Sequence, residues 1–342
     1  MQVASVNVAE HGAVADGQTD DTEAIRAAIA ALPERGGAVY FPPGHYVSDT
    51  IKAPHFVSFV GESGWAYKTP GPTILSPLRD DQPCLFDLHH NCGTRIKGLS
   101  LHGRDQGAEI DAIQASKIKG PDSPDEEQNF VVDDCWIAHW TGSAIAMHHA
   151  HVWCIRHNNI QFNGGHGIDG GKSCDAWVID NQVGHNGGCG MRISSSTTVT
   201  GNRFEQNGEC GLQFSRTYVE DCNVTGNHFC SERGTGIEII KSDYEDANIR
   251  SVSITGNLIR SSGQALDDSS ERNCNVRLED VNGITFVGNT VHARGPSKSP
   301  AVGIRIKGLT DCLIANNSLY NGATRKLIED LGGHTNTLDE NK

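Results

Sequence analysis

The sequence predicts an all-β solenoid, in which short strands stack coil upon coil along one axis. The main observation is an asparagine that recurs seven times, with an apolar residue three positions before it and another two positions after it. The copies recur every 21 to 32 residues, so a fixed structural unit alternates with loops of varying length. A second observation is the 39 glycines, which suit many tight turns. The repeated residues are Asn158, Asn181, Asn202, Asn227, Asn257, Asn289 and Asn317.

The segment before the repeats predicts a helix followed by two strands. Asp20 is the expected N-cap, and Glu23, three residues later, has the spacing of a capping box. Ile25 and Ile29 fall on one helical face, and the helix is expected to end near Pro33. The next stretch, GGAVYFPPGHYV, predicts two short strands around a Pro-Pro-Gly turn.

This opening segment carries a family resemblance. The stretches AEHGAVADGQTDDTEAIRAAIAAL and GGAVYFPPGHYV resemble the start of the pectate-lyase-like superfamily of right-handed parallel β-helices. That superfamily includes pectin-degrading hydrolases and lyases, alginate epimerases, fungal-type glucanases and phage tailspikes. The resemblance implies a single right-handed parallel β-helix of roughly ten coils, whose open end is capped by the N-terminal helix. The expected parts of this one domain are the cap and first strands over 1–50, the coils over 51–320 and a C-terminal tail over 321–342.

The repeated asparagines are expected to be structural. Identical amides on stacked coils can hydrogen-bond along the coil axis and satisfy the backbone of each turn. They therefore set the register in which other residues are placed. Strand alternation then separates the side chains that enter the core from those that face outward.

Composition excludes some partners. The 28 Lys and Arg against 42 Asp and Glu leave a formal charge of -14, which argues against nucleic acid. No apolar run approaches the length of a membrane span, so no membrane partner is expected. The N-terminus lacks the pattern of a signal peptide, so the expectation is a cytoplasmic protein or a secreted one whose signal has been removed. The 11 cysteines show no metal-binding spacing and are expected to be reduced core residues.

Residues with side chains that could take part in catalysis are concentrated on the outward face of one row of strands. His148, Asp169 and Arg192 fall on three consecutive coils, and Glu238 lies further along the same face. We expect these four residues to be catalytic and no metal to be bound. The residues expected to bind substrate are His166, Lys172, Gln213, Arg277, Glu279 and Arg305.

The first group suits a lyase-type reaction on a polysaccharide or oligosaccharide. Removing a proton next to a sugar carboxylate needs a base and a cation over the developing enolate, roles that His148 and Arg192 could fill. Alginate epimerases carry a Gly-Phe-Asp-Pro-His-type strand, which the segment 144–148 resembles. The histidine is kept, Ala146 stands in place of the aspartate, and an aspartate follows one coil later at Asp169. The resemblance therefore implies elimination, epimerisation or intramolecular transfer.

Three alternatives stay open. A glycoside hydrolase would use two carboxylates, Asp169 and one near Glu238, and the charged loop that follows offers Asp243, Glu245 and Asp246. A non-catalytic glycan-binding protein like a tailspike would be a homotrimer. A Ca²⁺ ion is the one cofactor considered, because lyases of this fold often use it; its candidate ligands are Asp169, Asp175, Glu238 and Asp243.

Overall fold

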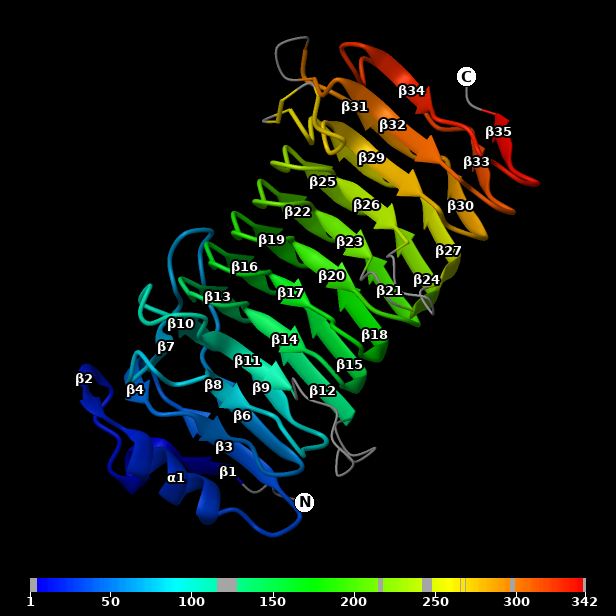
Figure 1. Ribbon diagram of the computed structural model, residues 1–342. Helices are drawn as coiled ribbons and strands as arrows, with labels where there is room; N and C mark the ends of the chain where they lie inside the picture. Colours follow the sequence, from blue (N-terminus) through cyan, green and yellow to red (C-terminus); the bar gives the residue numbers. More distant parts are fainter. Residues whose placement is uncertain are drawn as a thin grey trace. The chain divides into compact units, whose positions relative to one another are not determined.

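The computed structural model is built almost entirely of short parallel strands (Figure 1). It describes residues 5–115, 128–214, 218–241, 248–264, 266–267, 269–295 and 299–340. The chain forms two compact units, residues 1–169 and 170–342. No helix among the described residues is long and apolar enough to cross a membrane. The loop carboxylates Asp243, Glu245 and Asp246 lie outside the described residues.

The first unit begins with β1 (Ser5–Asn7), the 3-10 turn η1 (Val8–His11), β2 (Asp16–Asp20) and α1 (Thr22–Ala30). The predicted N-cap is wrong by one residue, because Asp20 is the last residue of β2 and pairs with Val47 of the next strand. Asp21 is the N-cap, although its side chain accepts from the backbone N–H of Val14 at 2.7 Å rather than capping the helix. Glu23 bonds Arg26 instead of forming a capping box. The two strands predicted around Pro-Pro-Gly are present as β3 and β4.

Three parallel sheets make up the first unit, and each coil takes one strand from each sheet. Sheet A contains β1, β3 (Gly37–Phe41), β6 (Val57–Gly61), β9 (Arg95–Lys97), β12 (Gln128–Asp133) and β15 (His151–Arg156). Sheet B contains β2, β4 (Gly44–Ser48), β7 (Thr73–Pro77), β10 (Ser100–His102), β13 (Trp136–Ala138) and β16 (Asn159–Gln161). Sheet C contains β5 (Ile51–Lys52), β8 (Cys84–Asp87), β11 (Asp111–Ala115), β14 (Ile145–Met147) and β17 (Ile168–Asp169).

The second unit has the same three kinds of strand. Sheet A contains β18 (Cys174–Ile179), β21 (Thr197–Thr200), β24 (Tyr218–Thr225), β27 (Asn248–Thr255), β30 (Ile284–Val287), β33 (Leu313–Ala315) and β35 (Leu338–Glu340). Sheet B contains β19 (Gln182–Gly184), β22 (Arg203–Glu205), β25 (His228–Cys230), β28 (Leu258–Arg260) and β31 (Thr290–His292). Sheet C contains β20 (Met191–Ile193), β23 (Leu212–Phe214), β26 (Ile237–Ile240), β29 (Cys274–Glu279), β32 (Val302–Lys307) and β34 (Lys326–Asp330). The predicted parallel β-helix is confirmed, and strands continue beyond residue 320 as β34 and β35.

The asparagine ladder is present and structural. In the second unit the side-chain amide of each ladder asparagine donates to the amide oxygen of the next one, at 2.9 to 3.0 Å, from Asn181 to Asn317. In the first unit Asn158 accepts from the backbone N–H of Cys135 at 2.9 Å. The residue before each ladder asparagine has a left-handed backbone, which explains why that residue is often glycine. These residues are His157, Asp180, Gly201, Gly226, Gly256, Gly288 and Asn316.

A second ladder, which the repeat pattern did not predict, lies five residues after Asn181, Asn202 and Asn227. Asn186 donates to Asn207, and Asn207 donates through its backbone and side-chain N–H groups to one oxygen of Glu232, at 2.7 and 3.0 Å. The residues before these positions are again left-handed, as at Gln206 and Ser231. Glu232 is completely buried and therefore occupies an asparagine position with a carboxyl group.

Candidate active site

Sheet C of the first unit aligns the polar residues predicted for its outward face. Lys52 is paired in register with Asp87, Asp87 with Gln114, Gln114 with Ala146, and Ala146 with Asp169. The residues between them, such as Ile113 and Ile145, enter the core. Lys52 is exposed and Asp87 and Gln114 are half-buried, whereas Ala146 and Asp169 are buried, so this row is open to a ligand on its first three coils and at the neighbouring His148.

His148 contacts Asp169 at the end of this row. Nε2 of His148 lies 3.2 Å from Oδ2 of Asp169. The aspartate side chain is only 6% exposed, whereas the histidine side chain is 26% exposed. A buried carboxylate at this distance orients the imidazole and determines which ring nitrogen carries the proton. The exposed part of the ring is thus left available to a substrate.

The other residues predicted from the sequence belong to the second unit or border it. Arg192 is half-buried on β20 and is paired in register with Gln213. Lys172 is exposed in the turn that follows β17. His166, in the first unit, is half-buried, and its backbone N–H donates to the hydroxyl of Ser143 at 3.2 Å.

Glu238, on β26, is held by three N–H donors. Nε and Nη2 of Arg272 donate to its two oxygens at 2.8 Å each, and Nε2 of Gln213 donates to Oε1 at 2.8 Å. Burial of Arg272 opposes its charge, but the bonds to Glu238 outweigh this and raise the pKa of Arg272. Glu238 is 1% exposed, so its carboxylate is committed to these partners. Arg272 lies in the charged stretch 265–273, and its sequence position gave no sign that it folds back onto β26.

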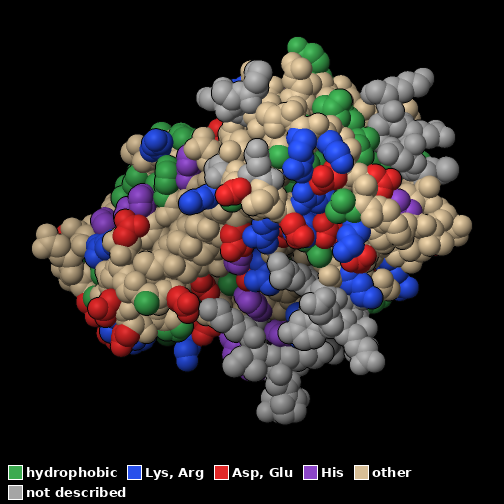
Figure 2. All heavy atoms as spheres, turned by 45° about the horizontal axis from the view of Figure 1, so that its top comes forward, with side chains coloured by type: hydrophobic (Ala, Val, Ile, Leu, Met, Phe, Trp, Pro, Cys, Tyr) green, Lys and Arg blue, Asp and Glu red, His purple; other side chains and the backbone are tan. Residues whose placement is uncertain are grey.

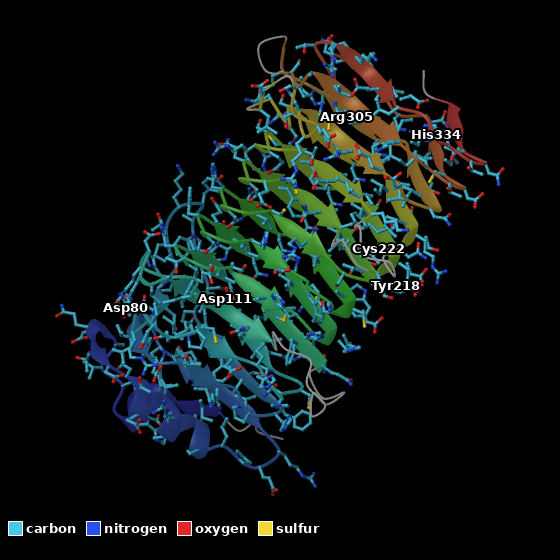
Figure 3. All side chains as sticks on the ribbon, viewed as in Figure 1. Asp80, Asp111, Tyr218, Cys222, Arg305 and His334 are labelled. Carbon is cyan, nitrogen blue, oxygen red and sulfur yellow. The ribbon has the colours of Figure 1, made fainter. Side chains whose placement is uncertain are left out.

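The remaining charged residues on sheet C of the second unit are also paired with one another. Arg277 makes two bonds to Glu279, at 2.9 and 2.8 Å, and Arg305 donates to Glu329 at 2.7 Å. Arg305 projects from β32 in Figure 3. These side chains are at most 11% exposed, although alternation places them on the outward face. They are buried because long side chains lie against one another, and acidic and basic groups interleave on the face shown in Figure 2.

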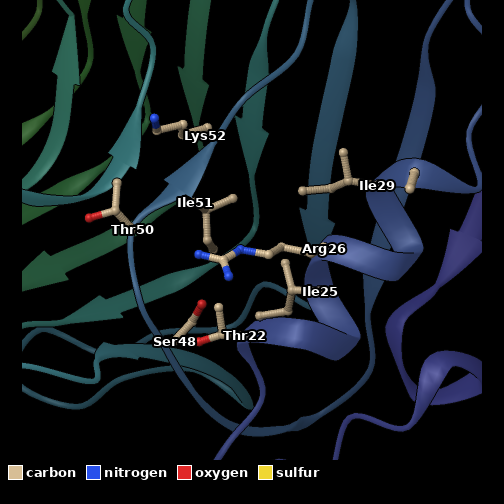
Figure 4. Close-up of a pocket in the computed structure, with 9 residues that line it drawn as sticks. Thr22, Ile25, Arg26, Ile29, Ser48, Thr50, Ile51 and Lys52 are labelled. Atoms are coloured by element: carbon tan, nitrogen blue, oxygen red, sulfur yellow. The ribbon is translucent and has the colours of Figure 1, made fainter.

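A cavity of about 200 Å³ lies between α1 and the strands β4 and β5 (Figure 4). Its walls include Ile25, Ile29 and Ile51. The hydroxyl of Thr50 donates to the carbonyl of Cys84 at 2.7 Å, and Arg26 is bonded to Glu23. Thr22, Ala30, Ser48 and Lys52 complete the lining, and none of the residues predicted for the site borders this cavity.

Two of the four carboxylates considered for Ca²⁺ already face other groups. Both oxygens of Glu238 face N–H donors, Asp169 faces His148, and Asp243 lies outside the described residues. Calcium needs six or more converging oxygens. Calcium binding therefore stays a prediction from the resemblance.

Comparisons with known proteins agree with this fold. Residues 5–71 match the family model described as rhamnogalacturonase A/epimerase, pectate lyase-like, and residues 125–278 match the right-handed β-helix region. Over 258 residues, 62% of the chain, it is 25% identical to mannuronan C5-epimerase AlgE3 of Azotobacter vinelandii. Over 199 residues, 52% of the chain, it is 30% identical to alginate lyase 7 of the same organism.

The chain spans only 14% and 21% of the lengths of these two relatives. The A-module of A. vinelandii mannuronan C-5 epimerase AlgE6 superposes with a TM-score of 0.72 at 17% identity, covering 98% of this chain and 99% of the module. At 17% identity, the superposition supports the fold but not a function. Sheets, ladder and sequence matches together make this chain a right-handed parallel β-helix protein, whose first 71 residues include a match to a pectate lyase-like family model.

Proposed function

We propose that this protein is a carbohydrate-active enzyme that removes the C5 proton of a uronate residue in an alginate-type polysaccharide. The observation that carries the proposal is the pair of His148 and Asp169, 3.2 Å apart on a face open to a ligand. The similarity to a mannuronan epimerase and an alginate lyase supports the choice of substrate class and reaction.

His148 is proposed as the group that exchanges the proton. With one ring nitrogen bonded to Asp169, the other can accept the C5 proton as the C–H bond breaks and the electron pair moves into the uronate carboxyl group. Returning a proton to the opposite face of C5 completes epimerisation. Breaking the C4–O bond instead, with a proton passing to the leaving oxygen, completes elimination. Asp169 acts as a positioning residue, and Arg192 stays a prediction for the cation that neutralises the enolate.

Hydrolysis is less well supported. It needs a carboxylic acid that can donate a proton and a second carboxylate on the other side of the bond. Glu238 is poorly suited to the acid role, because Arg272 and Gln213 bind both of its oxygens and favour its ionised form. If no product forms, the remaining alternative is a homotrimer that binds a glycan without catalysing a reaction.

The test uses polymannuronate, alginate and polygalacturonate as substrates. Ultraviolet absorbance detects unsaturated uronates, a reducing-end assay detects chain cleavage, and proton NMR detects inverted C5 centres. We expect one of the first two polymers to give unsaturated or inverted residues, and His148→Ala to lower the rate by roughly 100- to 10,000-fold.

The matched control is His151→Ala, which removes an exposed histidine on sheet A of the same unit and should keep full activity. Reducing ends without unsaturation would support the hydrolase instead. Full activity of His148→Ala would remove His148 from the mechanism. Binding of the polymers without any product would favour the tailspike-like alternative.

A further inference from the structure

A second cluster of charged residues lies on sheet B of the second unit, on a different sheet from the proposed active site. Its strands bury Phe204, Phe229, Ile259 and Val291, so the alternate residues face outward. Of those outward residues, Leu258 and Thr290 continue the row of His228, and the other six, called the sheet B cluster below, are Arg203, Glu205, His228, Cys230, Arg260 and His292.

Arg260 is a guanidinium without a carboxylate partner. Its Nη2 contacts the thiol of Cys230, a weak acceptor, and its Nε is buried with no hydrogen-bond partner among the described residues. Three other arginines of this unit, Arg272, Arg277 and Arg305, each bond a glutamate. A half-buried charged group normally has an opposite charge or a ligand beside it, because removing an unpaired charge from water costs free energy.

His228 presents a second donor that lacks an acceptor. Nη1 of Arg203 lies 2.9 Å from its Nδ1, and since a guanidinium can only donate, Nδ1 must be the accepting nitrogen. The ring proton is therefore on Nε2, which is buried and has no partner among the described residues. Burial, followed by the charges of Arg203 and Arg260, lowers the pKa of His228 to about 4, so the ring is neutral at pH 7.

Positive charge exceeds negative charge in the cluster. Glu205 is its one carboxylate, and that group is bonded to Nε of Arg203 at 2.9 Å. Burial opposes the ionisation of Glu205, but the bond and charge of Arg203 prevail and hold its pKa below the usual value. Burial and the charge of Arg260 likewise lower the pKa of His292. The cluster thus holds two guanidinium groups and one carboxylate, which bonds Arg203 and interacts with Arg260 only through its charge, in a chain whose formal charge is -14.

We infer that the sheet B cluster binds an oxyanion between Arg260 and His228. The ligand class is a carboxylate, phosphate or sulfate group, because these groups accept from several N–H donors at once and supply the missing negative charge. Arg203, His228, Arg260 and His292 each keep part of their surface exposed, so a ligand can approach the cluster from solvent, whereas Nε of Arg260 and Nε2 of His228 are themselves buried. The oxyanion belongs either to a free inorganic ion or to a uronate of a polysaccharide. This site does not depend on the proposed catalytic activity.

The experiment measures binding of inorganic phosphate and, separately, of a mannuronate trisaccharide by calorimetric titration. Arg260→Met should weaken the binding at least tenfold. Arg250→Met is the matched control, since Arg250 lies on sheet A of the same unit and already bonds Glu220, and it should change binding less than twofold. Saturation by phosphate alone identifies a free-ion site, and saturation by the trisaccharide alone identifies a glycan site.

The NMR titration of His228 in the unmodified protein provides a second readout that needs no variant. A bound anion offsets the two guanidinium charges, so saturating ligand should raise the pKa of His228 from about 4. Arg260→Lys, which keeps the charge, should retain more affinity than Arg260→Met. Absence of binding by both probes, an unchanged His228 titration, or equal affinity of Arg260→Met and unmodified protein would each overturn the inference.

Discussion

At the scale of single residues, the informative positions are polar groups that the coil buries. Glu232 occupies a slot that asparagine fills on neighbouring coils, and its other oxygen has no hydrogen-bond partner among the described residues. Burial raises the pKa of Glu232 from 4.5 to about 8, although the hydrogen bonds from the N–H groups of Asn207 act in the opposite direction. The carboxyl group is therefore protonated at neutral pH and substitutes for an amide.

The predicted consequence is a loss of stability as pH rises. Between pH 4.5 and about 8 the folded protein holds a proton at Glu232 that the unfolded chain has released. The free energy of unfolding should therefore fall by about 1.4 kcal/mol for each pH unit in this window from this group alone. Glu232→Gln cannot ionise, so urea unfolding at pH 5 and pH 8 should show a smaller loss for the variant. Parallel losses in both proteins would contradict this assignment.

A second residue-scale prediction concerns Glu238 and Arg272. Arg272→Gln leaves a carboxylate that is 1% exposed with only Gln213 and the more distant Arg277, at 3.9 Å, and should destabilise the fold by about 3 kcal/mol. Glu238→Gln should cost less, because the Arg272 side chain is 30% exposed and can be solvated. The double variant should be more stable than Arg272→Gln, as measured by chemical unfolding. If Glu238 were instead a catalytic acid, Glu238→Gln would abolish turnover by the folded enzyme.

At the scale of one coil, the turn before each ladder asparagine controls the register. Gly256 has φ near 63°, and a Cβ added there would meet no atom within 4 Å, so a substitution acts only through the backbone. Gly256→Ala should lower the free energy of unfolding by about 1–2 kcal/mol. Gly256→Asn should cost less, because Asn316 adopts the same conformation before the last ladder asparagine. Equal losses for alanine and asparagine in thermal unfolding would count against this explanation.

At the scale of the whole molecule, the β-helix presents each sheet as a separate surface. The coil register brings His148 and Asp169 together on sheet C of the first unit, and the sheet B cluster on the second unit is built from the same alternation. Net charge does not reveal such local differences, because a chain with a charge of -14 still concentrates Arg203 and Arg260 around one carboxylate.

The sequence by itself determined the fold, the ladder and the inward residues, because a period repeated seven times leaves one consistent coil register. The sequence also predicted that His148 and Asp169 lie close together, because both face outward at matching positions on consecutive coils. Only the tertiary structure decided which charges are already paired. Arg272 reaches Glu238 from a loop 34 residues away, and loops of varying length carry no periodicity from which that contact could be read. For the same reason, the sequence could not predict that Arg277, Glu279 and Arg305, which were expected to bind substrate, are buried against other charged side chains. Nor could it predict that Arg260 contacts a thiol and bonds no carboxylate.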